Sequence, residues 1–144
     1  MSVVMQWLHV LGAVLAVGGV AFARLVLIPS AEGLDEEARE TLMEGIQKRF
    51  RQVVALSIGL LLITGLYNVG IAAVAGSFSV SGYLYPMIFK LVLALVVFKI
   101  AFMLIVPGPA FSGVKAKRKT WLMVNLVLGA VVILLGAYLR RMSL

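Results

Sequence analysis

The sequence contains no cysteine, one histidine and few acidic residues. Without cysteine, disulfides, iron–sulfur clusters and thiolate zinc sites are excluded. The long apolar runs hold no carboxylate and no second histidine to activate a serine, so hydrolytic machinery is excluded as well. Redox chemistry would have to come from a bound cofactor. The acidic residues fall in one short segment and are Glu32, Asp35, Glu36, Glu37, Glu40 and Glu44.

Apolar residues dominate what is present. The 144-residue chain is 62% hydrophobic and 13% charged, and its mean hydropathy is +1.09, more apolar than a soluble globular protein needs. Four runs reach the roughly 20 residues that cross a bilayer. They are Val3–Ile28, Val53–Ala75, Leu84–Val106 and Trp121–Leu139. We therefore predict an all-α integral membrane four-helix bundle, with residues 1–144 forming a single four-span transmembrane domain.

The segments around these runs suggest how each helix begins and ends. The first run lacks a basic leader and is about twice the length of a signal-peptide core, so we expect a retained membrane helix. Pro29 is predicted to close it. Ala31–Gln52 is predicted to be a water-exposed helix leading directly into the second span, with Asp35 as its N-cap. The uncharged connector Gly70–Tyr83 and the Pro107-Gly108-Pro109 turn separate the remaining spans.

Basic residues predict the orientation. The first and third connectors carry Arg39, Lys48, Arg49, Arg51, Lys115, Lys117, Arg118 and Lys119. The second connector and the two termini carry only Arg140 and Arg141. The positive-inside rule then places both termini on the non-cytoplasmic side. We expect the membrane to be a bacterial cytoplasmic (inner) membrane. These basic clusters flank apolar spans, so the lipid bilayer is the expected partner and nucleic acid is not.

A stripe of small residues surrounds the single histidine. At 100° per residue, one side of the first helix presents Met5, His9, Gly12, Ala13, Ala16, Val20 and Ala23. Small residues mark the side where another backbone or a flat ligand approaches closely in a membrane, so His9 is predicted to point into the bundle. For the same reason two further stripes are predicted to face inward. They are Ser57, Thr64 and Asn68 on the second helix, and Asn125, Gly129, Val132 and Gly136 on the fourth.

Lys90 is the most informative charge. A charged side chain within the hydrocarbon costs about 3 kcal/mol on insertion scales and requires a partner or a route to water. The spans supply no carboxylate, which leaves a carbonyl, water, a lipid phosphate or an anionic ligand. Lys90 lies about two turns inside its span. At that depth its side chain could snorkel to the headgroups or hold an anion beside His9. Lys99 lies about 180° round the helix and is expected to snorkel to the other leaflet or to hydrogen-bond Asn125.

The sequence leaves two hypotheses for a metal bound at His9. In the first, His9 is an axial ligand of haem iron, the macrocycle lies against Gly12, and Lys90 or Arg140 holds a propionate. In the second, the thioethers of Met5 and Met87, with Met1 or Met142, join His9 around Cu(I). Flexible packing explains these methionines equally well. Successive soft ligands across the membrane are missing, which favours the porphyrin over a copper pathway.

A family resemblance rests on short motifs in a fixed order. The motifs are Trp7-Leu8-His9, Gly12, Gly18-Gly19, Arg24 with Pro29, Arg49-Phe50, Ile63-Thr64-Gly65-Leu66-Tyr67, Lys90 and Asn125. Over nearly the whole chain this order resembles the copper-resistance D-type membrane domain. More distantly it is similar to the small four-helix membrane protoporphyrinogen oxidases of bacteria. The resemblance implies a four-helix bundle that handles copper, or that binds haem through the first-helix histidine.

The resemblance also implies roles for individual residues. In the oxidases the first-helix histidine and the third-helix lysine are functional, and these map onto His9 and Lys90. This chain departs from the oxidase pattern where Lys99 lies near the place of a later histidine, and where no acidic residue and proline follow Asn125. An enzyme of this kind would be a haem-dependent oxidoreductase acting on a porphyrinogen. The copper-binding periplasmic module often fused to copper-resistance domains is missing, so copper delivery would need a separate periplasmic copper carrier.

The leading prediction is a protein that binds haem b or another porphyrin in the outer leaflet. Its binding residues are His9, Gly12, Tyr67, Asn68, Lys90 and Arg140. The alternative is a Cu(I) uptake or copper-resistance protein using Met5, His9 and Met87. A third hypothesis is that the protein is a structural membrane subunit without a ligand. We expect a homodimer in each case.

Overall fold

The structure, a computed structural model, describes residues 2–142 and is built from helices and their connections. The elements are α1 (Val3–Phe22), the π-helix η1 (Ala23–Leu27), α2 (Ile28–Ala31), α3 (Glu36–Val74), the short η2 (Ser77–Ser79), α4 (Leu84–Ile105), α5 (Ser112–Ala116) and α6 (Arg118–Met142). The prediction of an all-α chain is confirmed for the described residues.

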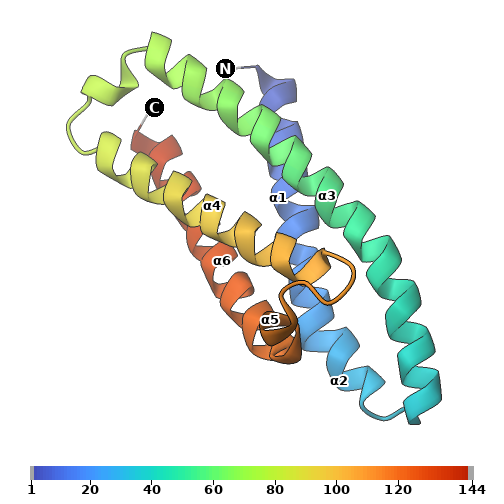
Figure 1. The fold of residues 1–144 in the computed structure, drawn as a ribbon. Coiled ribbons are helices and arrows are strands. Elements are labelled where there is room, and N and C mark those ends of the chain that lie inside the picture. The colour runs from blue at the N-terminus through green and yellow to red at the C-terminus, as the bar shows by residue number, and fades with distance from the viewer. Residues whose placement is uncertain (1, 143–144) are drawn as a thin grey trace.

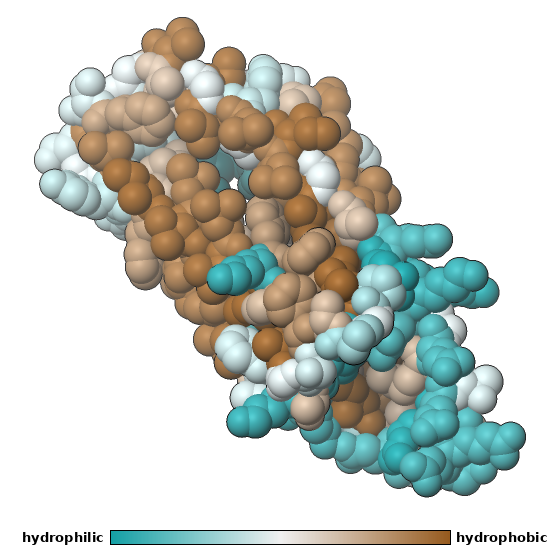
Figure 2. All heavy atoms as spheres, viewed as in Figure 1, coloured by the Kyte–Doolittle hydropathy of each residue, from teal (hydrophilic) through white to brown (hydrophobic). Residues whose placement is uncertain are grey.

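Four helical rods are long and apolar enough to cross a membrane, as predicted. They are the continuous run Val3–Ala31, α3, α4 and α6. The 39 residues of α3 correspond to about 58 Å at 1.5 Å per residue, almost twice the thickness of the hydrocarbon. The excess is the polar start of α3. In Figure 2 hydrophilic residues gather at one end of the molecule, while apolar residues cover most of the remaining surface.

The rods form two antiparallel pairs. α1 packs along α3, α4 packs along α6, and α1 also contacts α6 (Figure 1). Both termini lie at the end where α3 connects to α4, which we call the terminal end. The residues that join α2 to α3, together with α5, lie at the opposite end, which we call the charged end. Near the terminal end α3 and α4 are spread apart, so the two pairs diverge there.

The distribution of exposure is inverted relative to a soluble protein. Ser57, Thr64 and Asn125 are 0%, 1% and 3% exposed, whereas Val74 and Tyr85 are 90% and 81% exposed. Apolar side chains on the outside and polar or small ones inside suit a protein whose surroundings are lipid. The three predicted inward stripes are therefore confirmed in their orientation, with Gly12, Thr64 and Gly129 all buried.

Two apolar clusters hold the bundle together. The cluster nearer the charged end joins α1 and η1 to α4 and α6 through Val20, Ala23, Ile100, Leu104 and Leu122. The cluster nearer the terminal end joins the end of α3 to α4 and α6 through Ala72, Tyr83, Met87 and Leu139. The terminal half of α1, which carries His9, belongs to neither cluster. Its position depends instead on α3.

The first helix does not end where the sequence predicted. Helical structure continues through Pro29 to Ala31, so the prediction that Pro29 closes the run is wrong. The π-helical turn of η1 lies directly before it and changes the hydrogen-bonding register. Because proline lacks an N–H, it is tolerated where a shift in register, or the first turn of a new helical segment, leaves that donor unneeded. Pro29 lies at the start of α2.

Other span boundaries differ by one to three residues, and the helix predicted to begin at Ala31 begins at Glu36. α4 ends at Ile105 and α6 begins at Arg118, three residues before the predicted start at Trp121. Basic residues are good helix formers, and the apolar pattern alone does not include them in a helix. Asp35 takes the N-cap position of α3 with the extended backbone that an N-cap adopts, but its side chain makes no cap hydrogen bond.

Candidate functional site

His9 of α1 lies directly against α3. Its Nδ1 atom is 2.8 Å from the hydroxyl oxygen of Thr64, which is 1% exposed. Two glycines let the helices approach at this level. A Cβ added at Gly65 would lie 3.7 Å from Cε1 of His9, and one added at Gly12 would lie 3.1 Å from Cγ of Leu61. The predicted inward orientation of His9 is therefore confirmed, and its partner is a hydroxyl group.

The hydrogen bonds around Thr64 fix which nitrogen of His9 carries the proton. Thr64 donates its single hydroxyl hydrogen to the carbonyl oxygen of Leu60 at 2.5 Å. The hydroxyl oxygen can then only accept from His9, so Nδ1 must be the donor. In the neutral ring, Nε2 therefore keeps a free lone pair. Nε2 has no hydrogen-bond partner among residues 2–142.

Lys90 of α4 points into the bundle and packs on α6. A Cβ added at Gly136 would lie 3.4 Å from Nζ of Lys90 and 3.6 Å from its Cε. The absence of a side chain at Gly136 thus makes room for the ammonium group. Lys90 is half-buried, and within the described part of the chain its ammonium group has no ion-pair partner.

His9 and Lys90 lie at the same depth. α1 and α6 touch where a Cβ on Gly129 would approach Cγ2 of Val17 to 3.0 Å. From that contact His9 is eight residues toward the terminal end, and Gly136 is seven, which correspond to about 12 Å and about 10.5 Å along the helices.

His9 of α1 and Lys90 of α4 both lie in the terminal half of the bundle. In the terminal half, Figure 2 shows an opening in the apolar face through which hydrophilic atoms are visible. The site thus combines an imidazole with a free lone pair and an ammonium group at about the same depth.

Asn68 extends the polar lining by one turn. It lies four residues after Thr64 on the same face of α3, is half-buried, and its Oδ1 is buried without a partner among the described residues. Tyr67 is 37% exposed and lies on a neighbouring face of α3. The structure therefore places Asn68, but not Tyr67, on the face that holds Thr64.

Arg140 lies beside α1 in a different groove. It lines a cavity of about 310 Å³ together with residues from the first three turns of α1, which are Ser2, Val3, Gln6, Trp7 and Val10. The centre of this face of α1 is roughly 90° round the helix from His9. Arg140 also takes part in an interaction, so it is not a free charge.

The predicted methionine ligands have separate environments. Met5 is half-buried one turn from His9 on the same face of α1. Met87 is 9% exposed and packs in the terminal apolar cluster with Leu139, and Met142 packs against that cluster. Met1 lies outside the described residues. Residues 2–142 contain no group of three or more His, Cys, Asp or Glu side chains that could hold a metal ion.

Of the two alternatives predicted for Lys99, the hydrogen bond to Asn125 is not formed. Lys99 is exposed on α4, as a snorkelling lysine would be, while Oδ1 of Asn125 is buried and has no partner within residues 2–142. The separation of about 180° from Lys90 places Lys99 on the outer, apolar surface. Arg24 has a hydrogen-bond partner on α6, because its Nε donates to the carbonyl oxygen of Lys119 at 3.0 Å.

Sequence reasoning grouped Thr64 with Ser57 and Asn68 but did not pair it with His9. Depth did not indicate this pair, since Thr64 lies near the middle of its predicted span and His9 less than two turns inside the first.

No known protein family, curated protein or solved structure matches this chain.

Proposed function

We propose that this protein is an integral membrane bundle that binds haem b, or another metalloporphyrin, through Nε2 of His9. The observation that carries the proposal is the chain of hydrogen bonds from His9 Nδ1 to Thr64 and from Thr64 to the carbonyl of Leu60. A ligating histidine is oriented in this way by a partner on its other nitrogen, which also fixes the tautomer. The free lone pair of Nε2 is what axial ligation of iron requires.

The residues around His9 fit the rest of such a ligand. Haem carries two carboxylates, and Lys90 supplies an ammonium group at the same depth with no ion-pair partner among the described residues. Gly12 is buried against Leu61, so it supports the site by allowing α1 to pack closely on α3. The bound iron would supply electron-transfer chemistry. The protein residues would fix its axial ligand, neutralise a propionate and exclude bulk water.

An absorption spectrum tests the proposal. The full chain purified in a mild detergent and titrated with haem should give a Soret band whose position changes on binding. His9→Ala should abolish that change. Gln6→Ala is the matched control, since Gln6 is half-buried on the adjacent face of the same helix and lines the groove that holds Arg140. An unchanged spectrum in His9→Ala excludes His9 as the ligand, provided that its thermal unfolding midpoint matches the control.

A Cu(I) site is the second candidate. Met5 lies one turn from His9 on the same face, so a thioether and the free Nε2 can reach one ion. The sulfur of Met87 would have to leave the terminal apolar cluster to join them. Copper retained by the wild-type chain and lost in Met5→Ala and His9→Ala, without a haem signal, would favour this candidate. A periplasmic copper carrier would then be the expected partner.

We also propose that both termini face the non-cytoplasmic side of a bacterial inner membrane. The charged end carries the basic residues of two connectors, and the positive-inside rule places such segments in the cytoplasm. The His9 site would then lie in the outer leaflet. Reporter fusions at residue 144 test this orientation, because a periplasmic reporter should be active there and a cytoplasmic one inactive. The reverse pattern would place the site in the inner leaflet.

A further inference from the structure

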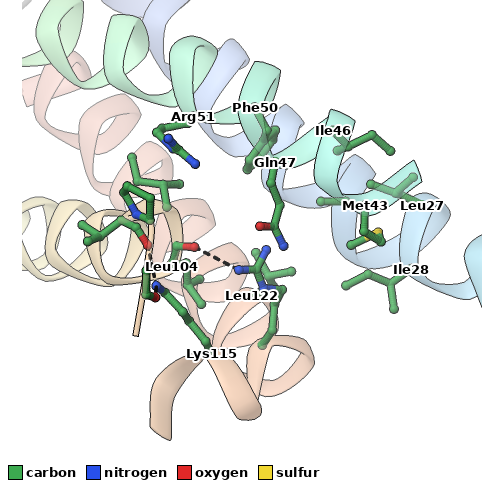
Figure 3. A pocket seen from close by; sticks show the side chains of 16 residues that line it. Leu27, Ile28, Met43, Ile46, Gln47, Phe50, Arg51, Leu104, Lys115 and Leu122 are labelled. Carbon is green, nitrogen blue, oxygen red and sulfur yellow. Dashed lines mark hydrogen bonds between the residues drawn. The ribbon is translucent and has the colours of Figure 1, made fainter. Parts of the chain in front are cut away.

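A second site lies at the charged end, about the length of a span away from His9. It is a cavity of about 340 Å³ enclosed by η1, α2, the polar part of α3, the end of α4, α5 and the start of α6 (Figure 3). The haem and copper sites predicted from the sequence do not involve this cavity. Its lining has a cationic side and an apolar side.

The cationic side comes from three separate elements. Arg51 and Gln47 belong to α3, Lys115 to α5 and Arg118 to α6. In Figure 3 the polar ends of Arg51, Gln47 and Lys115 turn toward the same space. Lys115 donates to the carbonyl oxygens of Val106 and Gly108, and Arg118 donates to that of Leu104 at 3.1 Å. Carbonyl oxygens carry only partial charge, so these cations remain without a full counter-charge in the cavity.

The positive charge of Arg51 has even fewer partners. Its Nε is buried and has no hydrogen-bond partner within residues 2–142. None of the described residues that line the cavity is acidic. A buried guanidinium nitrogen without an acceptor is costly, and three cations around one space also repel each other. An anion in the cavity would relieve both costs.

The apolar side indicates what else the ligand carries. Leu27, Ile28, Met43, Ile46 and Phe50 line the part of the cavity next to the cations, as Figure 3 shows. Arg51 lies two residues before the apolar part of α3 begins at Val53. This is the depth at which a phospholipid headgroup meets its acyl chains.

We propose that this cavity binds a phosphoryl group, held by Arg51 and Arg118, with an apolar tail against the α2–α3 side. The planar guanidinium fork matches phosphate oxygens in a bidentate manner, and Lys115 adds a point charge. An anionic phospholipid and free inorganic phosphate share this headgroup chemistry. The apolar lining favours the phospholipid. This proposal does not depend on the function of His9.

Thermal unfolding of the delipidated full chain in dodecyl maltoside tests the site. The probes are dioleoyl-phosphatidylglycerol, dioleoyl-phosphatidylcholine and inorganic phosphate. Arg51→Gln removes the unpartnered cation. Arg49→Gln removes the same charge two residues away on an exposed face of α3 that does not line the cavity. Phosphatidylglycerol should raise the unfolding midpoint of the wild type and of Arg49→Gln, and should bind Arg51→Gln about tenfold more weakly.

Each probe result has a definite meaning. Stabilisation by phosphatidylglycerol but not by inorganic phosphate identifies a lipid as the ligand, and equal stabilisation by the two identifies the free anion. Stabilisation of the wild type by phosphatidylcholine to the same degree as by phosphatidylglycerol overturns the proposal, and so does a normal response of Arg51→Gln. If Arg51→Gln does not fold, Arg51→Lys replaces it and should bind more weakly than the wild type while keeping the charge.

Discussion

His9 and Thr64 lie 55 residues apart in the chain, and their side chains meet at 2.8 Å between Nδ1 and Oγ1. The threonine is committed as a donor to its own helix, so it acts toward the histidine only as an acceptor. One buried hydroxyl group thereby determines both the rotation of the ring and the nitrogen that remains available to a ligand.

Replacement of Thr64 should weaken ligand binding without unfolding the protein. Thr64→Val keeps the shape of the side chain but leaves Nδ1 of His9 without an acceptor, so the tautomer is no longer fixed. We expect haem affinity to fall by about 10- to 100-fold, the usual effect of losing a partner of a ligating histidine. Thr64→Ser keeps the hydroxyl group and should bind like the wild type. Equal haem affinity for Thr64→Val and the wild type would show that Thr64 does not orient the ligand.

Replacing each of the two membrane lysines with methionine should have different effects on haem binding. Lys90→Met removes an ammonium group that points into the bundle, whereas Lys99→Met removes one from the outer surface. We expect Lys90→Met to bind haem about tenfold more weakly and to be at least as stable as the wild type, since burying the charge is costly. Lys99→Met should leave haem binding unchanged. Haem titration and thermal unfolding in detergent measure both effects, and the opposite ranking would remove Lys90 from the site.

Two glycine substitutions should have opposite effects on stability. A Cβ at Gly129 would lie 3.0 Å from Cγ2 of Val17, and valine has little rotamer freedom on a helix, so α1 and α6 must separate. We expect Gly129→Ala to cost about 1–3 kcal/mol. Gly59→Ala meets no atom within 4 Å and should be neutral or stabilising by up to about 1 kcal/mol.

The reason for the Gly129 effect can be checked by a double variant. Val17→Ala removes the atoms that a methyl group on Gly129 would meet. Combined with Gly129→Ala, it should recover part of the lost unfolding free energy. If Gly129→Ala is as stable as Gly59→Ala, the close packing of α1 against α6 is not as described.

Low pH should weaken one contact at the charged end. Glu32 pairs with Lys119, and the hydrogen bond and charge of Lys119 lower the pKa of Glu32, with smaller effects from Arg24 and Arg39. Because the folded pKa is below the unfolded one, this contribution to stability is complete above about pH 4.3 and is lost as the pH falls through the folded pKa. The pair is exposed, so the effect should be small and weaker at high salt.

Carboxyl carbon NMR measures this directly. In Lys119→Gln the pKa of Glu32 should rise toward the ordinary glutamate value. Lys117→Gln removes the same charge two residues away and should leave the titration of Glu32 nearly unchanged. A Glu32 titration that ignores Lys119 would contradict the pairing.

The spans were predictable because length and hydropathy depend on the bilayer and not on neighbouring helices. The inward stripes were predictable for a related reason, since glycine, serine and asparagine at helical spacing have no favourable place against lipid. The end of the first helix was not, because the π-helical turn before Pro29 has no simple sequence signal. The spacing correctly placed Lys99 and Lys90 on opposite faces of their helix. It could not show that Oδ1 of Asn125 would have no partner among residues 2–142.

The pairing of His9 with Thr64 required the rotation and register of two helices, which one sequence does not supply. The cavity at the charged end was even less predictable from the sequence. It is assembled from α3, α5 and α6, and Arg51 and Arg118 are 67 positions apart (118 − 51). The sequence shows basic residues in both connectors, but not that they face one space.

The most direct test of the account is the protonation of His9. Because it is the only histidine, labelling with ¹⁵N-histidine gives signals from this residue alone. At neutral pH in ligand-free detergent micelles, Nδ1 should carry the proton and Nε2 should give the signal of an unprotonated nitrogen, which shifts when haem is added. A ring protonated at Nε2, or an Nε2 signal that does not respond to haem, would contradict the account.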